Sequence, residues 1–202
     1  DMGFDAYVDG TALHRAAGFD ISGDYLGSPP GSPTLVKEIG GMKIAIVGLY
    51  NRHRDEAIAD IRAARKKGDV VIAFMHWGDD FHSKVAGSQR TQGHESSDAG
   101  ADAIVGAHAH VVLPEEIYEG KLISYGLGNF VFTGMDKPGT RNGALLELDI
   151  EPKRGIVGHR YRKLTVDDQG TPRFVSDEAT AEPFVDPPLS APQNEPIPVP
   201  AR

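Results

Sequence analysis

The chain has 202 residues, 40% of them hydrophobic and 25% charged, which is ordinary for one globular domain with a sizeable core. Its formal net charge of −8 argues against nucleic acid or an anionic membrane surface as the main partner. The absence of cysteine excludes disulfides, thiolate nucleophiles and cysteine-ligated zinc, and no apolar run approaches the ~20 residues of a membrane span.

The first third of the chain alternates helical and extended patterns. Apolar residues at helical spacing predict a helix over residues 4–17. Two β-rich runs, Thr34–Ile39 and Met42–Leu49, are joined by a Gly-Gly pair, which is typical of a hairpin with a two-residue turn. Asp55–Lys67 is predicted to be a helix that Asp55 caps and Gly68 ends.

A central strand is predicted at Val70–Met75, because this run is continuously apolar and rich in β-forming residues. His76 follows at its carboxyl end. Ligand sites of open α/β sheets lie outside the carboxyl ends of the strands, so His76 is a candidate site residue. Taken alone, it is better explained as a hydrogen-bonded loop histidine, and only together with two further histidines does a site become the favoured interpretation.

A second buried strand is predicted at Ala103–Val105, followed by Gly106, which would let the backbone turn. In extended backbone the i, i+2 spacing of His108 and His110 places both imidazoles on one face, where they can share a metal ion. A third apolar run, Lys121–Ser124, ends in a glycine-rich segment that indicates a tight turn or a close backbone approach.

The three strands are predicted to be neighbours in one α/β sheet with flanking helices. His76, His108 and His110 should then converge at its C-terminal edge. Neutral imidazole suits Zn, Mn and Fe, and a two-metal site also needs bridging carboxylate or amide ligands. Signatures of serine hydrolases, P-loop proteins, dinucleotide-binding proteins and H-E-x-x-H metalloproteases are absent from the sequence.

The C-terminal third holds two further strand patterns. Gly143–Ile150 and Gly155–Val166 are predicted to pair as an antiparallel edge of the same sheet. The last twenty residues contain seven prolines and offer no apolar periodicity. We therefore predict one domain over residues 1–182 and a flexible tail over 183–202.

Two segments carry a family resemblance. His76-Trp77-Gly78-x-Asp80-Phe81 resembles the HWG-x-E-Y signature of CapA-type poly-γ-glutamate capsule proteins. The run GADAIVGAHAHVVLPEEIYEGKLISYGLGNFVF, residues 100–132, resembles that family's GAD-x-x-x-G-x-H-x-H and Y-S-L-G-N-F-V-F block. The family has the fold of calcineurin-like metallophosphatases, so the resemblance implies a layered α/β sandwich with mixed sheets.

The resemblance also implies a site. Carried over residue by residue, it assigns three ligands of a divalent two-metal centre (Zn, Mn or Fe): His76, His108 and His110. Asn129 matches the asparagine of the family's G-N-F, and Asp80 stands where the family has glutamate, so both are candidate catalytic residues. Phe81 replaces the family's tyrosine, and that hydroxyl is lost.

The function implied is a metal-dependent hydrolase of phosphoester or amide bonds in poly-γ-glutamate capsule synthesis, acting on a polymer or small molecule. The alternative is a non-catalytic protein that binds, assembles or exports the capsule polymer on the same fold. The family's G-D, N-L-E and N-N-H motifs would precede Asp1, so we expect an N-terminal part of the fold outside this chain. A bacterial, extracytoplasmic or membrane-associated location would follow from such a segment. By family analogy Ser88–Ala99 is a helix, and its polar sequence predicts weak packing and partial mobility.

Overall fold

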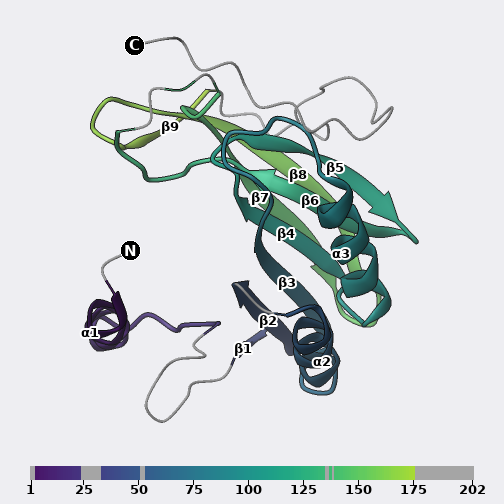
Figure 1. Cartoon of the computed structure of the whole chain (residues 1–202). Helices are drawn as coiled ribbons and strands as arrows, with labels where there is room; N and C mark the ends of the chain where they lie inside the picture. Colours follow the sequence, from purple (N-terminus) through teal and green to yellow (C-terminus); the bar gives the residue numbers. More distant parts are fainter. Residues whose placement is uncertain (1–2, 24–32, 51–52, 135–136, 138, 176–202) are drawn as a thin grey trace.

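The computed structural model describes residues 3–23, 33–50, 53–134, 137 and 139–175 (Figure 1). The predicted tail at 183–202 lies outside the described residues, so the boundary at residue 182 stays a prediction. None of the helices in these ranges combines the length and apolar character that crossing a membrane requires.

A six-stranded mixed sheet in the order β1-β2-β3-β4-β6-β5 forms the centre of the molecule. β2, β3, β4 and β6 run parallel, while β1 and β5 pair antiparallel at the two edges. The strands are β1 (Thr34–Ile39), β2 (Met42–Tyr50), β3 (Val70–Trp77), β4 (Ala103–His108), β5 (Val112–Tyr118) and β6 (Lys121–Leu127). The α/β class and the adjacency of the three central strands are therefore confirmed, whereas β5 was not predicted.

The predicted β1–β2 hairpin is also confirmed. Ile39 pairs with Met42 across a turn made of Gly40 and Gly41. Both glycines have positive φ, 58° and 77°, as a two-residue hairpin turn with the twist of its strands requires.

Helices α2 (Arg54–Arg65) and α3 (Gly87–Asp98) lie against one face of the sheet (Figure 1). Ala57, Ile61 and Ala64 form the buried stripe of α2. The predicted cap was wrong: the helix begins one residue before Asp55, and its first flanking residue makes no side-chain cap bond. Asp55 instead lies in the first turn, where its charge favours the positive end of the helix dipole.

α3 packs more closely than its polar sequence predicted. Gln89, Gly93, Ser96 and Ser97 are buried against the sheet. A Cβ at Gly93 would lie 3.2 Å from a methyl carbon of Ile123, so the glycine permits a close helix–sheet approach. Small residues make this contact, and a search for apolar periodicity misses them. The predicted mobility of α3 stays a prediction.

A second sheet, in the order β7-β8-β9, contacts β5 and β6 through β7. Its strands are β7 (Asn142–Glu151), β8 (Gly155–Val166) and β9 (Pro172–Phe174). The antiparallel pairing of β7 and β8 is confirmed, but their assignment to the edge of the first sheet was wrong. The chain leaves β6 through a bridge between Gly128 and Gly143, and Cβ atoms at these glycines would meet backbone oxygens at 2.4 and 2.0 Å. Because neither glycine has a side chain, the two backbones can approach here, and the chain passes from the first sheet into the second.

The first helix, α1 (Gly3–Ala16), has no buried residue, and Gly18 follows it with a φ of 86°. Its extent agrees with the predicted helix to within a residue at each end.

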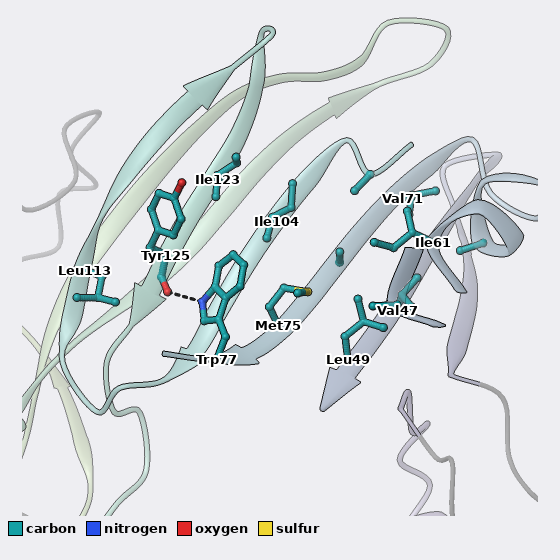
Figure 2. Close-up of a cluster of buried hydrophobic side chains, with 14 of the residues drawn as sticks. Val47, Leu49, Ile61, Val71, Met75, Trp77, Ile104, Leu113, Ile123 and Tyr125 are labelled. Carbon is teal, nitrogen blue, oxygen red and sulfur yellow. Dashed lines mark hydrogen bonds between the residues drawn. The ribbon is translucent and has the colours of Figure 1, made fainter. Parts of the chain in front are cut away.

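Gly106 has a different role from the predicted turn. It lies inside β4, where a Cβ would be 2.0 Å from the Tyr125 carbonyl oxygen and 2.4 Å from Trp77 Nε1. Trp77 Nε1–H donates a 2.9 Å hydrogen bond to that carbonyl across the buried core (Figure 2). Gly106 is therefore needed so that Trp77 and Tyr125 can pack closely against β4.

Candidate histidine site

Two neighbouring parallel strands bring the predicted histidines to the same edge of the sheet. In the β3–β4 register, His76 lies opposite Ala107 and Trp77 lies opposite His108. Parallel strands end at a common edge, so the side chains that follow one strand meet those that follow the next.

The three imidazole rings lie near one another. The ring centroids of His76 and His108 are 4.5 Å apart, and those of His108 and His110 are 6.4 Å apart. All three side chains are at least partly exposed. The structure thus gathers into one surface cluster the residues that the sequence pattern selected.

The backbone of this cluster is not extended, contrary to the expectation from the i, i+2 spacing. β4 ends at His108, and both His108 (φ 102°) and His110 (φ 59°) have left-handed backbone. Phe81 beside them has a φ of 64°, and its N–H donates a 2.8 Å hydrogen bond to the Ala109 carbonyl. Such conformations cost about 1–3 kcal/mol per residue and concentrate at functional sites. The chain bends here instead of continuing the strand, and the bend sets the directions of the rings.

Asn129 holds His110 in a defined orientation. Its Nδ2 donates a 2.8 Å hydrogen bond to the Thr140 carbonyl, which directs Oδ1 toward His110 Nδ1 at 2.8 Å. Because Asn Oδ1 only accepts, we assign the proton of neutral His110 to Nδ1, which leaves the lone pair on Nε2. Ligand histidines in metal sites are oriented by the same kind of contact.

The other candidate, Asp80, faces the cluster from the loop after β3. Its Oδ1 is 3.6 Å from His108 Nε2, longer than a hydrogen bond, and its side chain is 53% exposed. Asp80 therefore approaches His108 as an exposed carboxylate, whereas Asn129 contacts His110 as a buried amide.

Aromatic rings line the cluster, and two of them, Tyr50 and Phe132, were not among the predicted site residues. Tyr50 meets His76 edge-on at 4.9 Å, and Phe132 meets His110 edge-on at 4.9 Å. Phe81, at the position where the tyrosine hydroxyl is lost, stacks on His110 at 5.7 Å. The only sequence signal for Phe132 was its place at the end of the G-N-F-V-F segment.

The electrostatics of the cluster favour neutral imidazole at His76. Partial burial is the largest cause that lowers the pKa of His76, and the nearby charges of His108 and His110 lower it further. A neutral ring retains the lone pair that metal ligation requires.

The donor chemistry of the cluster therefore suits a divalent cation. However, within the described ranges no three or more His, Asp or Glu side chains stand in an arrangement that could hold a metal ion. The rings form neighbouring pairs, and the assignment of His76, His108 and His110 as ligands stays a prediction.

Comparison with known proteins shows the family to which this chain belongs. The model of the family "Bacterial capsule synthesis protein PGA_cap" matches residues 1–134, which include all five candidate site residues. The chain belongs to this family.

Particular relatives carry related names. The chain is 42% identical over 92 residues to the PGA biosynthesis protein CapA of Bacillus subtilis, an alignment covering 45% of this chain and 24% of the relative. It is 38% identical over 77 residues to a probable polyglutamine synthesis accessory protein of Mycobacterium tuberculosis, covering 38% of this chain and 20% of the relative. The matched part thus spans about a quarter or less of these relatives' length. A crystal structure of a hypothetical protein from Thermus thermophilus matches with a TM-score of 0.43 and 19% identity, over 76% of this chain and 64% of that one.

Proposed function

We propose that the histidine cluster is part of a divalent-metal site for hydrolysis of phosphoester or amide bonds in the synthesis of a poly-γ-glutamate capsule. The observation that carries this proposal is the pairwise proximity of three imidazoles at two strand ends, His76 beside His108 and His108 beside His110, which Asn129 holds in place. Membership of the capsule synthesis family supports the biological setting.

Each residue has a distinct part in the proposed reaction. His76, His108 and His110 would hold the cation, which would supply Lewis-acid activation of water and of a phosphoryl or carbonyl oxygen. Asp80 Oδ1, exposed beside His108, would accept the proton of the attacking water. Asn129 keeps the His110 proton on Nδ1, and the stacked ring of Phe81 shields that imidazole from solvent.

A second function is a non-catalytic role in assembling or exporting the polymer. The name of the Mycobacterium tuberculosis relative, a probable polyglutamine synthesis accessory protein, favours this role. In that case the cluster would bind the polymer or a cation without turnover.

Metal titration tests the proposal. We expect Zn²⁺ to shift, and paramagnetic Mn²⁺ to broaden, the ring NMR signals of His76, His108 and His110 together. His108→Ala and His110→Ala should each weaken binding by at least about tenfold, because losing a ligand should matter no less than losing its outer-shell support. His82→Ala removes a nearby imidazole outside the trio and is the matched control.

Hydrolysis separates the two functions. If the proposal holds, the metal-loaded chain cleaves a generic phosphodiester or a γ-glutamyl amide, and both alanine variants lose that activity. Metal binding without turnover, together with binding of poly-γ-glutamate, would favour the accessory role. If the ring signals do not respond to metal, the proposed metal site is wrong.

A further inference from the structure

A cavity of ≈ 200 Å³ opens between α2, α3 and the end of β3. Leu49, Ile58 and Met75 supply an apolar wall, and His76 lies at its margin. The cavity therefore shares His76 with the histidine cluster, and its other lining residues lie outside that cluster.

Gln89 gives this cavity an unused hydrogen-bond donor. The residue is only 2% exposed, and its Oε1 accepts a 2.9 Å hydrogen bond from the Ala86 N–H at the start of α3. Its buried Nε2 has no hydrogen-bond partner among the described residues. Most buried polar groups are paired, so an unpaired amide in a cavity wall points to a ligand that accepts from it.

Gly78 permits the close approach of this amide to the end of β3. A Cβ at residue 78 would lie 2.6 Å from Gln89 Nε2, so any larger residue would press on the donor. Gly78 also lines the cavity.

The charge at the rim decides which acceptor fits. Arg54 and Glu95 both line the cavity, and the guanidinium pairs with the carboxylate through two hydrogen bonds. Arg54 and Glu95 satisfy each other, so neither of them offers an anion or a cation an unpaired countercharge at the described part of the rim. A neutral oxygen acceptor on an apolar stem matches both the lone donor and the apolar wall.

We infer that this cavity binds a neutral amide on a short aliphatic stem, whose carbonyl oxygen accepts a hydrogen bond from Gln89 Nε2 and whose stem packs on Met75 and Ile58. Binding itself needs no metal. Only the use of the cavity as a substrate subsite beside His76 depends on the proposed function.

The test is an NMR titration of the metal-free chain with valeramide. Binding should shift the Gln89 side-chain NH₂ signals and the methyl signals of Met75 and Ile58. Valerate, which has the same stem but a negative charge, should bind at least about tenfold more weakly. Equal or tighter binding of valerate would overturn the amide assignment.

Two variants locate the binding site. Gln89→Glu keeps an oxygen for the Ala86 N–H but removes the donor, and it should weaken valeramide binding about tenfold, the size of one hydrogen bond. Ile58→Trp fills the cavity while leaving Gln89 in place, and it should abolish binding even if the first variant folds poorly. Gln169→Glu, the same change at an exposed loop, should have no effect.

Valeramide binding that survives both cavity variants would place the ligand elsewhere and end the inference. If the metal-loaded parent chain shows no hydrolysis but still binds valeramide, the result counts against the proposed function alone.

Discussion

At the scale of single residues, the site depends on the hydrogen bond that fixes His110. Asn129 is 6% exposed and uses both ends of its amide, one on the Thr140 carbonyl and one on His110. The orientation of a partly exposed ring is thus set by a buried residue 19 positions away in the sequence.

Replacing Asn129 with alanine should release this ring. Near pH 8, where an ordinary histidine is neutral, we expect His110 in the parent chain to carry its proton on Nδ1. Asn129→Ala should populate the Nε2–H form, which is the more common tautomer of free imidazole side chains in solution, and should weaken metal binding about 10–100-fold.

Imidazole ¹⁵N chemical shifts distinguish the two tautomers directly. Asn129→Asp retains an acceptor oxygen toward Nδ1 and serves as the conservative variant. If the ¹⁵N shifts of His110 are the same in the parent and the alanine variant, the hydrogen bond does not control the ring.

At the scale of elements, a cluster of polar side chains connects α3 to the sheet. Glu116 of β5 accepts hydrogen bonds from Tyr125 of β6 at 2.7 Å and from Arg90 of α3 at 3.4 Å, and it lies 2.7 Å from His94 Nε2. The His94 ring also stacks on Tyr118 at 3.9 Å. These contacts replace the apolar stripe that α3 lacks.

This cluster predicts a pH dependence of stability. Burial alone would raise the pKa of Glu116, but hydrogen bonds from Tyr125 and His94 and the charges of His94 and Arg90 outweigh burial and lower that pKa. A carboxyl whose pKa is lower in the folded state stabilises the fold above its unfolded pKa of about 4.3. That contribution is lost as the pH falls through the lowered folded value.

Urea unfolding between pH 6 and pH 3 would measure this effect. We expect Glu116→Gln to be less stable than the parent at pH 6 and to lose less stability on acidification. Glu38→Gln, at an exposed carboxylate of β1, is the control and should follow the parent. Parallel curves for the parent and Glu116→Gln would show that Glu116 does not couple protonation to folding.

At the scale of the whole molecule, the two faces of β3 have different surroundings. Met75 faces the helices and is 7% exposed, whereas its neighbour Phe74 points to the opposite face and is 43% exposed. Central strands of parallel sheets are ordinarily covered on both sides. The second sheet packs against β5 and β6, and the side of β3 that carries Phe74 remains accessible in the described part of the chain.

Serine substitutions at Phe74 and Met75 should distinguish the accessible face of β3 from its buried face. Phe74→Ser should reduce binding of the hydrophobic dye ANS while changing the free energy of unfolding by less than about 1 kcal/mol, because its ring is already largely hydrated. Met75→Ser, one residue along, should cost about 2–5 kcal/mol through a cavity and a buried hydroxyl. Trp77, the only tryptophan of the sequence, reports unfolding by fluorescence. A comparable loss of stability in both variants would mean that Phe74 is also packed.

Local patterns in the sequence determined most of the strands, the hairpin turn and the edge of the sheet at which the histidines lie. Alternation, apolar runs and paired glycines act on near neighbours in the chain, so these features follow from short segments such as Thr34–Ile39 and Val70–Met75. The prediction that His76, His108 and His110 share one edge needed only strand direction.

Tertiary structure alone decided how the layers and the site are built. It placed β7 and β8 in a second sheet, buried Gly106 under the Trp77–Tyr125 hydrogen bond and set His110 against Asn129. The partners in these contacts are 19 to 48 residues apart along the chain, as in the His110–Asn129 and Trp77–Tyr125 pairs. Their energies depend on close packing between elements, which no periodicity within one segment records.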